Sequence, residues 1–243
     1  MHEPQKVSLE RIYPLTMNPE TQADKDSLDI HLSRYEFASQ HLSGQRVLDM
    51  ACGCGYGSHL MAKAHPDKQF IGVDIDPSAV EFANEHYQLD NLSFVQADAT
   101  AFSSEPFDTI VSLETIEHLP DLKALFRNFV ALSHQHTIIV ASVPSTPTCD
   151  GNPHHLHDFT ERSFLKRFRA ISFAPVSHFR QVQPWVYDDA FSTDEQSKSR
   201  SKGIGWRLMR YYLRKPSALF SRLHSLLVHG RCNKYITTVF KRA

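Results

Sequence analysis

Runs of apolar, mostly β-branched residues recur along the chain, and stretches with helical spacing of apolar positions lie between most of them. Strands that alternate with helices in this way are typical of βαβ units and of a parallel sheet. The sequence therefore predicts an α/β fold with a parallel sheet. The apolar runs are RVLDM, QFIGVDI, LSFVQA, FDTIVSL and HTIIVASV.

Further elements are predicted on both sides of this alternating region. Leu28, Leu32 and Tyr35 lie at helical spacing, and Gly44 follows as a helix-ending residue, so a lead-in helix is expected over residues 27–42. Near the carboxyl end, the segments SFAPVSHFRQV and KYITTVFKR both predict strands.

Charge is distributed unevenly along the chain. Of the 26 Lys and Arg residues, 12 fall within residues 198–242, a stretch that contains none of the 27 acidic residues. A basic tail on an acidic body suggests a partner for the tail.

The basic segment is also amphipathic. Basic amphipathic helices can lie on an anionic membrane or bind phosphate groups. The alternative is that the apolar stripe packs on the domain while the arginines face water. The apolar stripe consists of Trp206, Met209 and Leu213, and the basic stripe of Arg207, Arg210 and Arg214.

No apolar run near the amino terminus fits a signal peptide, and no segment approaches the roughly 20 apolar residues that span a bilayer. We therefore expect a cytoplasmic protein with one domain over residues 1–243. Peripheral contact with the inner face of the membrane is the further expectation for the basic segment.

The strongest local signal is VLDMACGCGYGS over residues 47–58, where a hydrophobic strand leads into a glycine-rich turn. Glycine there lets the backbone approach a ligand without a Cβ in the way. Asp74, 19 residues beyond Gly55, ends the next strand, where a carboxylate can accept hydrogen bonds from both ribose hydroxyls. The turn lacks the dinucleotide fingerprint, and Asp49 beside it disfavours a pyrophosphate and favours a cationic ligand. These features predict an adenosine-type cofactor.

The turn resembles the first motif, VLDxxCGxG, of the class I S-adenosylmethionine-dependent methyltransferases, and the resemblance covers about residues 24–185. It implies an α/β fold with a Rossmann-like, doubly wound, mostly parallel seven-stranded sheet. The last strand would be antiparallel, with a helical basic insertion before it. The implied divisions are a lead-in and helix over 1–44, a cofactor-binding core over 45–185, an insertion over 186–233 and a final strand over 234–243.

The same resemblance implies S-adenosylmethionine as the cofactor, with S-adenosylhomocysteine as its product. Asp49, Gly53 and Gly55 would line the methionine end, Asp74 would hold the ribose, and Ile75 would pack on the adenine. Asp98, with Ala99 beside it, would meet the adenine amino group. The full expected cofactor set is Tyr35, Asp49, Ala51, Gly53, Gly55, Asp74, Ile75, Asp98, Ala99 and Leu113.

The segment FDTIVSLETIEHLPD places Glu114, Glu117 and His118 just beyond a strand, where open parallel sheets bind their ligands. Many small-molecule methyltransferases resemble this chain in having a Glu-His pair there. The N/D-P-P-Y/F signature of amino methyltransferases that act on nucleic acid is absent, so nucleic acid is not expected as a partner.

A histidine-rich loop, NPHHLHDFT, follows the fifth predicted strand and should arch over the site. We expect its histidines to contact substrate or act as a base, with no metal, although a metal site and a solvent-exposed loop are the alternatives. The expected catalytic residues are His118 and His155. The expected substrate-binding residues are Glu114, Glu117, Asn152, His154, His157, Arg207 and Arg210.

This loop and the segment HLSRYEFA resemble a methyltransferase subgroup of bacterial polysaccharide biosynthesis, which shows N-P-x-H-x-x-E/D-F/Y-T/S and H-x-x-R-Y-x-F-A. On that match Asn152 and His155 fit the loop motif, and His31, Arg34 and Tyr35 fit a helix that closes over the cofactor. The interpretation is an O-methyltransferase of a sugar, a sugar nucleotide or a polysaccharide intermediate. The alternatives are an O-methyltransferase of another small molecule, such as a quinone-like phenol, and a non-catalytic cofactor-binding or nucleic-acid-binding domain.

Overall fold

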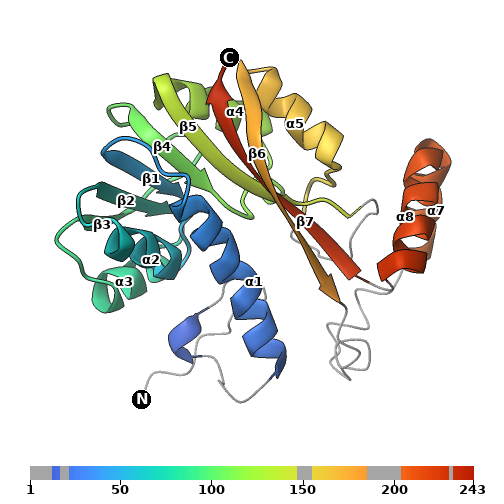
Figure 1. Cartoon of the computed structure of the whole chain (residues 1–243), viewed down its shortest axis with the longest axis horizontal. Helices are drawn as coiled ribbons and strands as arrows, with labels where there is room; N and C mark the ends of the chain where they lie inside the picture. The colour runs from blue at the N-terminus through green and yellow to red at the C-terminus, as the bar shows by residue number, and fades with distance from the viewer. Residues whose placement is uncertain (1–12, 17–21, 147–154, 185–203, 230–231) are drawn as a thin grey trace.

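The computed structural model describes residues 13–16, 22–146, 155–184, 204–229 and 232–243. Its strands form one sheet, and most of its helices cover the two faces of that sheet (Figure 1). The strands are β1 (Arg46–Met50), β2 (Gln69–Asp74), β3 (Leu92–Gln96), β4 (Phe107–Ser112), β5 (Ser133–Pro144), β6 (Phe173–Pro184) and β7 (Cys232–Arg242). The helices are η1 (Pro14–Thr16), α1 (Gln22–Ser39), α2 (Tyr56–Ala64), α3 (Pro77–His86), α4 (Leu122–Ala131), α5 (Glu161–Arg169), α7 (Ile204–Arg214) and α8 (Pro216–His229).

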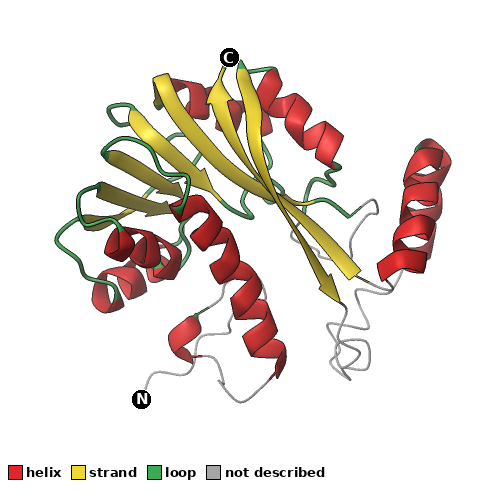
Figure 2. Ribbon diagram, viewed as in Figure 1, coloured by secondary structure: helices red, strands yellow, loops and turns green. Residues whose placement is uncertain are grey.

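The strand order is β3-β2-β1-β4-β5-β7-β6. Strands β1 to β5 pair in parallel, whereas β7 lies antiparallel between β5 and β6 (Figure 2). The predicted seven-stranded, doubly wound sheet with an antiparallel last strand is confirmed. Its topological switch lies between β1 and β4, where open sheets of this kind bind their ligands.

Successive side chains of β1 pack in two different apolar clusters, one on each face of the sheet. Leu48 and Met50 belong to the apolar cluster that contains α4 and α5, whereas Val47 belongs to the cluster that contains α1 and α2. Successive side chains of a strand point to opposite faces, so a strand covered on both sides reads as continuously apolar. This explains why consecutive apolar residues stand side by side in both strands, at 47–48 in β1 and at 110–111 in β4.

Aromatic side chains fill the core under α4 and α5. The ring of Phe168 stacks on that of Phe240 of β7 with centroids 3.8 Å apart, and Phe126, Phe129 and Phe164 surround the pair. All five are buried. The apolar face of helix α5 therefore packs against strand β7 in one aromatic cluster.

Two predicted boundaries are wrong. Helix α1 runs over Gln22–Ser39 rather than over 27–42, because the chain leaves the helix in a turn that includes a bond from His41 N to Ala38 O. Strand β7 begins at Cys232, inside the expected insertion, because Cys232 already pairs with Pro184 of β6.

Helices α7 and α8 expose much of their apolar surface, which the described part of the chain does not cover. Trp206 and Met209 are exposed, Leu213 is 75% exposed and Leu227 is 87% exposed. The alternative that the apolar stripe packs on the domain does not hold for its three residues Trp206, Met209 and Leu213, which are all exposed. None of the helices in the described ranges is both long enough and apolar enough to cross a bilayer.

Replacing Phe168 by Ala is expected to lower the free energy of unfolding by about 3–5 kcal/mol, because a fully buried ring and its stacking partner are lost. Denaturant-induced unfolding followed by circular dichroism measures this change. Arg127→Ala, on the exposed side of α4, is the matched control and should stay within about 0.5 kcal/mol of the parent protein. Equal effects of the two substitutions would contradict the proposed packing.

Candidate active site

A cavity of about 270 Å³ opens beyond the carboxyl ends of the parallel strands. The turns after β1, β2 and β4 form its walls, and residues of α1 contribute to its lining. Eight of the ten residues expected to bind the cofactor line this cavity, namely Tyr35, Ala51, Gly53, Asp74, Ile75, Asp98, Ala99 and Leu113.

The turn after β1 depends on glycine at defined points. Gly55 has a φ of 88°, and a Cβ there would lie 2.7 Å from Ala83 and from the ring of Phe94. A Cβ on Gly57, at the start of α2, would collide with the ring of Tyr35. The glycines therefore allow the turn to pack tightly between α1, α3 and β3 while its backbone faces the cavity.

Asp74 is the carboxylate at the centre of the cavity wall. One oxygen, Oδ2, accepts a hydrogen bond of 2.9 Å from Gly53 N, and Oδ1 accepts one of 2.9 Å from Asp76 N. These two backbone donors fix the orientation of the Asp74 carboxylate, whose residue lines the cavity. This geometry suits the predicted role in holding a ribose.

Asp49 and Gly55 do not belong to the lining of this cavity. The Asp49 side chain lies buried beneath the turn, where its Oδ2 accepts a hydrogen bond of 2.6 Å from Ser58 Oγ of α2. Burial raises the pKa of Asp49 to about 7, with a smaller contribution from the charge of Asp74; hydrogen bonds from Ser58 and Tyr35 act in the opposite direction. Asp49 therefore lies one layer behind the cavity wall.

Another part of the cavity lining contains apolar side chains and a carboxylate that is held by hydrogen bonds. Ile75 is 62% exposed and lines the cavity together with Ala99. Asp98 Oδ1 accepts bonds of 2.7 Å from both the backbone N and the hydroxyl of Thr100. An exposed apolar side chain beside a fixed acceptor is suitable for a flat base that carries an amino group.

Arg34 of α1 is a buried cation in the cavity lining, with 1% of its surface exposed. Its Nη1 lies 3.4 Å from Glu114 Oε2, and its Nε donates a bond of 2.8 Å to Gln181 Oε1 of β6. Its guanidinium carbon lies 4.2 Å from the ring centroid of Tyr235 of β7. Neighbouring His31 has its pKa lowered to about 3 by burial and by the charge of Arg34, so His31 is neutral near pH 7.

Glu114 lines the cavity in a left-handed backbone conformation, with a φ of 50°. Ser142 of β5 holds it twice, because Glu114 N donates to Ser142 Oγ (2.9 Å) and Ser142 Oγ donates to Glu114 Oε1 (2.6 Å). Glu114 thus uses its carboxylate on Ser142 and Arg34, and its expected contact with substrate remains a prediction.

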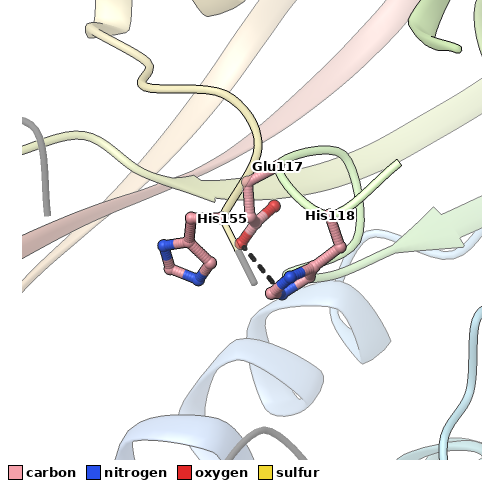
Figure 3. Close-up of side chains that lie close together, drawn as sticks. All are labelled: Glu117, His118 and His155. Atoms are coloured by element: carbon pink, nitrogen blue, oxygen red, sulfur yellow. Dashed lines mark ion pairs between the residues drawn. The ribbon is translucent and has the colours of Figure 1, made fainter. Parts of the chain in front are cut away.

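Glu117, His118 and His155 come together (Figure 3) beside the part of the cavity that His118 lines, which we call its mouth. Glu117 is fully buried and lies between the two imidazoles. His118 Nε2 is 4.0 Å from Glu117 Oε1, and the two histidine rings have centroids 4.8 Å apart. The loop after β5 therefore brings one histidine of its cluster to the Glu-His pair that follows β4.

The remaining expected substrate residues lie elsewhere. His157 is directed to the backbone, with its Nε2 2.9 Å from Leu119 O, and lines a second pocket near α5 and α8. Arg210 is exposed on α7 and does not line the cofactor cavity. The side chain of Arg207, on the same helix, lies outside the described part of the structure. Asn152 and His154 lie outside the described residues.

Comparison with known proteins gives a family. A protein-family model described as a methyltransferase domain matches residues 41–178, more than half of the chain. This chain belongs to that methyltransferase domain family. The predicted enzyme class is thereby confirmed.

Solved structures agree with the methyltransferase fold. The YcgJ protein from Bacillus subtilis superposes with a TM-score of 0.64 at 17% identity, covering 87% of this chain and 99% of that one. A methyltransferase from Thiobacillus denitrificans, in complex with S-adenosylhomocysteine, gives 0.54 at 15% identity, covering 92% and 99%. At these identities the similarity shows the fold.

Curated relatives of this methyltransferase domain align over part of their length. Phthiotriol/phenolphthiotriol dimycocerosates methyltransferase of Mycobacterium leprae is 28% identical over 109 residues, which cover 44% of this chain and 40% of that protein. Phosphoethanolamine N-methyltransferase 1 of Triticum aestivum is 40% identical over 91 residues, covering 36% and 18%. The alignments therefore span less than half of these relatives.

Several residues of the methyltransferase site were not expected from the sequence. Cys54 and Tyr56 line the cavity, and Ser142 holds Glu114 from within an apolar strand. Ser142 had a detectable signal, since it interrupts the run HTIIVASV with a polar side chain. Gln181 and Tyr235, which contact Arg34 from β6 and β7, had no signal in the sequence, because these contacts depend on the packing of distant segments.

We expect Asp49→Asn to change how the stability of this methyltransferase domain depends on pH. A folded-state pKa near 7, raised from 3.8, gives the parent protein a contribution to stability that is present at low pH and is lost as pH rises toward 7. Asparagine does not titrate, so the variant does not lose this contribution. The difference between the free energies of unfolding of the variant and of the parent protein should therefore shift by about 2 kcal/mol in favour of the variant when the pH is raised from about 5.5 to 8.5. Denaturant unfolding at both pH values measures it.

Asp67→Asn is the control, because Asp67 is an exposed aspartate. Its free energy of unfolding should follow that of the parent protein at both pH values. If Asp49→Asn did the same, Asp49 would not carry the raised pKa.

Proposed function

We propose that this chain is an S-adenosylmethionine-dependent methyltransferase that methylates a hydroxyl group of a sugar, a sugar nucleotide or a polysaccharide intermediate. The observation that carries the proposal is the position of the His118 and His155 pair at the mouth of the cavity that Asp74 and the glycine turn define. The methyl donor would lie in the cavity, and the acceptor hydroxyl would lie between the donor and the histidine pair.

Several features support S-adenosylmethionine as the cofactor. The family match and the solved neighbour with bound S-adenosylhomocysteine both favour it. Asp74 would accept from the ribose hydroxyls, and the face of Ile75 with Asp98 would receive the adenine. Arg34, buried in the lining, would pair with the carboxylate of the methionine part, since guanidinium groups bind carboxylates through paired donors.

Methyl transfer is an in-line displacement. The acceptor oxygen forms a bond to the methyl carbon while the bond from that carbon to sulfur breaks, and the electron pair of the broken bond stays on sulfur. The products are the methyl ether and S-adenosylhomocysteine, and the hydroxyl proton is released. His118 lines the cavity, and the ring of His155 lies 4.8 Å from that of His118, so these two imidazoles would activate the hydroxyl.

A sugar acceptor is supported by the sequence motifs around Arg34 and His155 and by the polar groups at the cavity mouth. The second candidate is methylation of another small molecule, including a lipid-like phenol, and two relatives favour it by name. One is the dimycocerosates methyltransferase and the other the phosphoethanolamine N-methyltransferase. A screen that turns over phenols or amines but no nucleotide sugar would favour this candidate.

Calorimetric titration with S-adenosylhomocysteine tests the cofactor directly. We expect binding at about micromolar Kd, no binding of NAD, and an affinity at least about tenfold weaker for Asp74→Asn, because hydrogen bonds to a charged acceptor are lost. Asp67→Asn should bind like the parent protein. Tight binding of NAD, or no effect of Asp74→Asn, would overturn the assignment of the cavity.

We further propose that α7 and α8 bring the enzyme to an anionic membrane surface where a lipid-linked acceptor is presented. Exposed apolar side chains of both helices, including Leu213 and Phe220, lie on the same helix pair as Arg210, Arg214 and Arg222. Apolar insertion and attraction to anionic lipid act together on such a surface. Nucleic acid is also anionic and would compete with the membrane for these arginines, but more weakly.

Sedimentation with vesicles tests this contact. We expect the protein to bind phosphatidylglycerol vesicles, to bind phosphatidylcholine vesicles less, and to lose at least about tenfold in affinity when Leu213 and Phe220 are both replaced by Ser. Val176→Ser, an exposed apolar position on β6, is the control and should bind normally. Absence of vesicle binding, with the double variant instead converting a dimer to a monomer in light scattering, would assign the surface to a second copy of the chain.

A further inference from the structure

We propose that Glu117, His118 and His155 form a binding site for one divalent first-row transition-metal ion at the mouth of the cofactor cavity. The inference deepens the proposed function, on which the role given to the ion rests, and it departs from the sequence-based expectation that no metal is bound. The ion would hold the acceptor hydroxyl next to the methyl donor.

The geometry of the three side chains is close to that of a metal site. One ligand atom from each residue can be chosen so that all three lie within 4.8 Å of one another. Metal-to-ligand distances of about 2.0–2.2 Å place neighbouring ligand atoms of a tetrahedral ion roughly 3.3–3.5 Å apart. The ligand atoms would have to approach one another by at most about 1.5 Å, which is within reach of side-chain rotation.

Backbone hydrogen bonds hold the two ligand-bearing segments together. Leu156 N and His157 N donate to Glu117 O at 2.8 and 3.2 Å, so the residue next to His155 is tied to the backbone of Glu117. The bond from His118 N to Thr115 O, 3.1 Å long, fixes the turn that carries His118. The cluster is therefore built by the fold, in contrast to a chance meeting of surface side chains.

The ligand types indicate the class of ion. Two imidazoles and one carboxylate are ligands of catalytic Zn²⁺ sites and of sites for other first-row ions such as Mn²⁺ and Fe²⁺, whereas Mg²⁺ prefers oxygen ligands. Glu117 is fully buried, and attraction between a carboxylate and a cation is stronger in such a low-dielectric place than in water. A divalent ion bound by Glu117 and the two imidazoles would benefit from this attraction.

The position of His118 gives the ion a role in the reaction. His118 lines the cofactor cavity and is partly exposed, so coordination positions not filled by protein would face the acceptor. An ion bound to the acceptor oxygen acts as a Lewis acid and makes its proton easier to lose. With His118 and His155 bound to the ion, activation of the hydroxyl comes through the ion, and the proton passes to solvent water instead of to an imidazole. The oxygen forms its bond to the methyl carbon, and the sulfonium sulfur keeps the electron pair of the bond that breaks.

The test uses the untagged full chain, first dialysed against a chelator. Calorimetry with Zn²⁺ and visible absorption with Co²⁺ should both show one ion per chain. Glu117→Gln and His155→Ala should each weaken binding by about tenfold or more, since even residues that only support metal ligands cost 10- to 100-fold in affinity when removed. His136→Ala removes an exposed histidine from the start of β5 and should bind the ion like the parent protein.

Each variant is also titrated with S-adenosylhomocysteine, which is expected to bind normally because the Asp74 side of the cavity is unchanged. This titration separates the two proposals. If the parent protein did not bind S-adenosylhomocysteine, the proposed function would be wrong, whereas the ion site would not be affected by that result. No stoichiometric ion in the parent protein, or equal binding in Glu117→Gln, His155→Ala and His136→Ala, would overturn the ion site while leaving the cofactor site intact.

Discussion

The buried guanidinium of Arg34 connects more of this structure than any other polar group described above. It extends from α1 to Glu114 beyond β4, to Gln181 of β6 and to the ring of Tyr235 of β7. A buried charge is tolerated only when several partners compensate for its lost hydration. The lead-in helix, the strained turn at Glu114 and the antiparallel end of the sheet are thus held in register by one side chain. Two of these parts, the lead-in helix and the turn at Glu114, contribute to the lining of the cofactor cavity.

The balance of charge around the cavity explains which ligand it selects. Asp74, Asp98 and Glu114 line it, Asp49 lies behind it, and Arg34 is the buried cation among them. A pyrophosphate would meet carboxylates where dinucleotide-binding folds present bare helix N–H groups. A ligand with a positive centre and one carboxylate matches this arrangement better, because each of its charges has an opposite partner.

The fold and the cofactor half of the site could be predicted because their signals are local. Strand and helix periodicity gave the sheet, and the spacing from Gly55 to Asp74 follows from one βαβ unit. The depth of Asp49 could not be read from the motif, since that depends on which face of β1 its side chain takes. The loop histidines were equally ambiguous, and the hydrogen bonds to Glu117 O decide that His155 approaches His118 while His157 turns to Leu119.

The pairing of Pro184 with Cys232 closes the segment between β6 and β7 at its base. Both ends of that segment leave from neighbouring, hydrogen-bonded strands, so its length and composition can change without altering the register of the sheet or the turn after β1. Loops of this kind tolerate insertion because the cost of closing them grows slowly with length. Related domains could therefore exchange this segment as a unit, acquiring a different docking surface for the acceptor while the methyl donor remains bound in the same way.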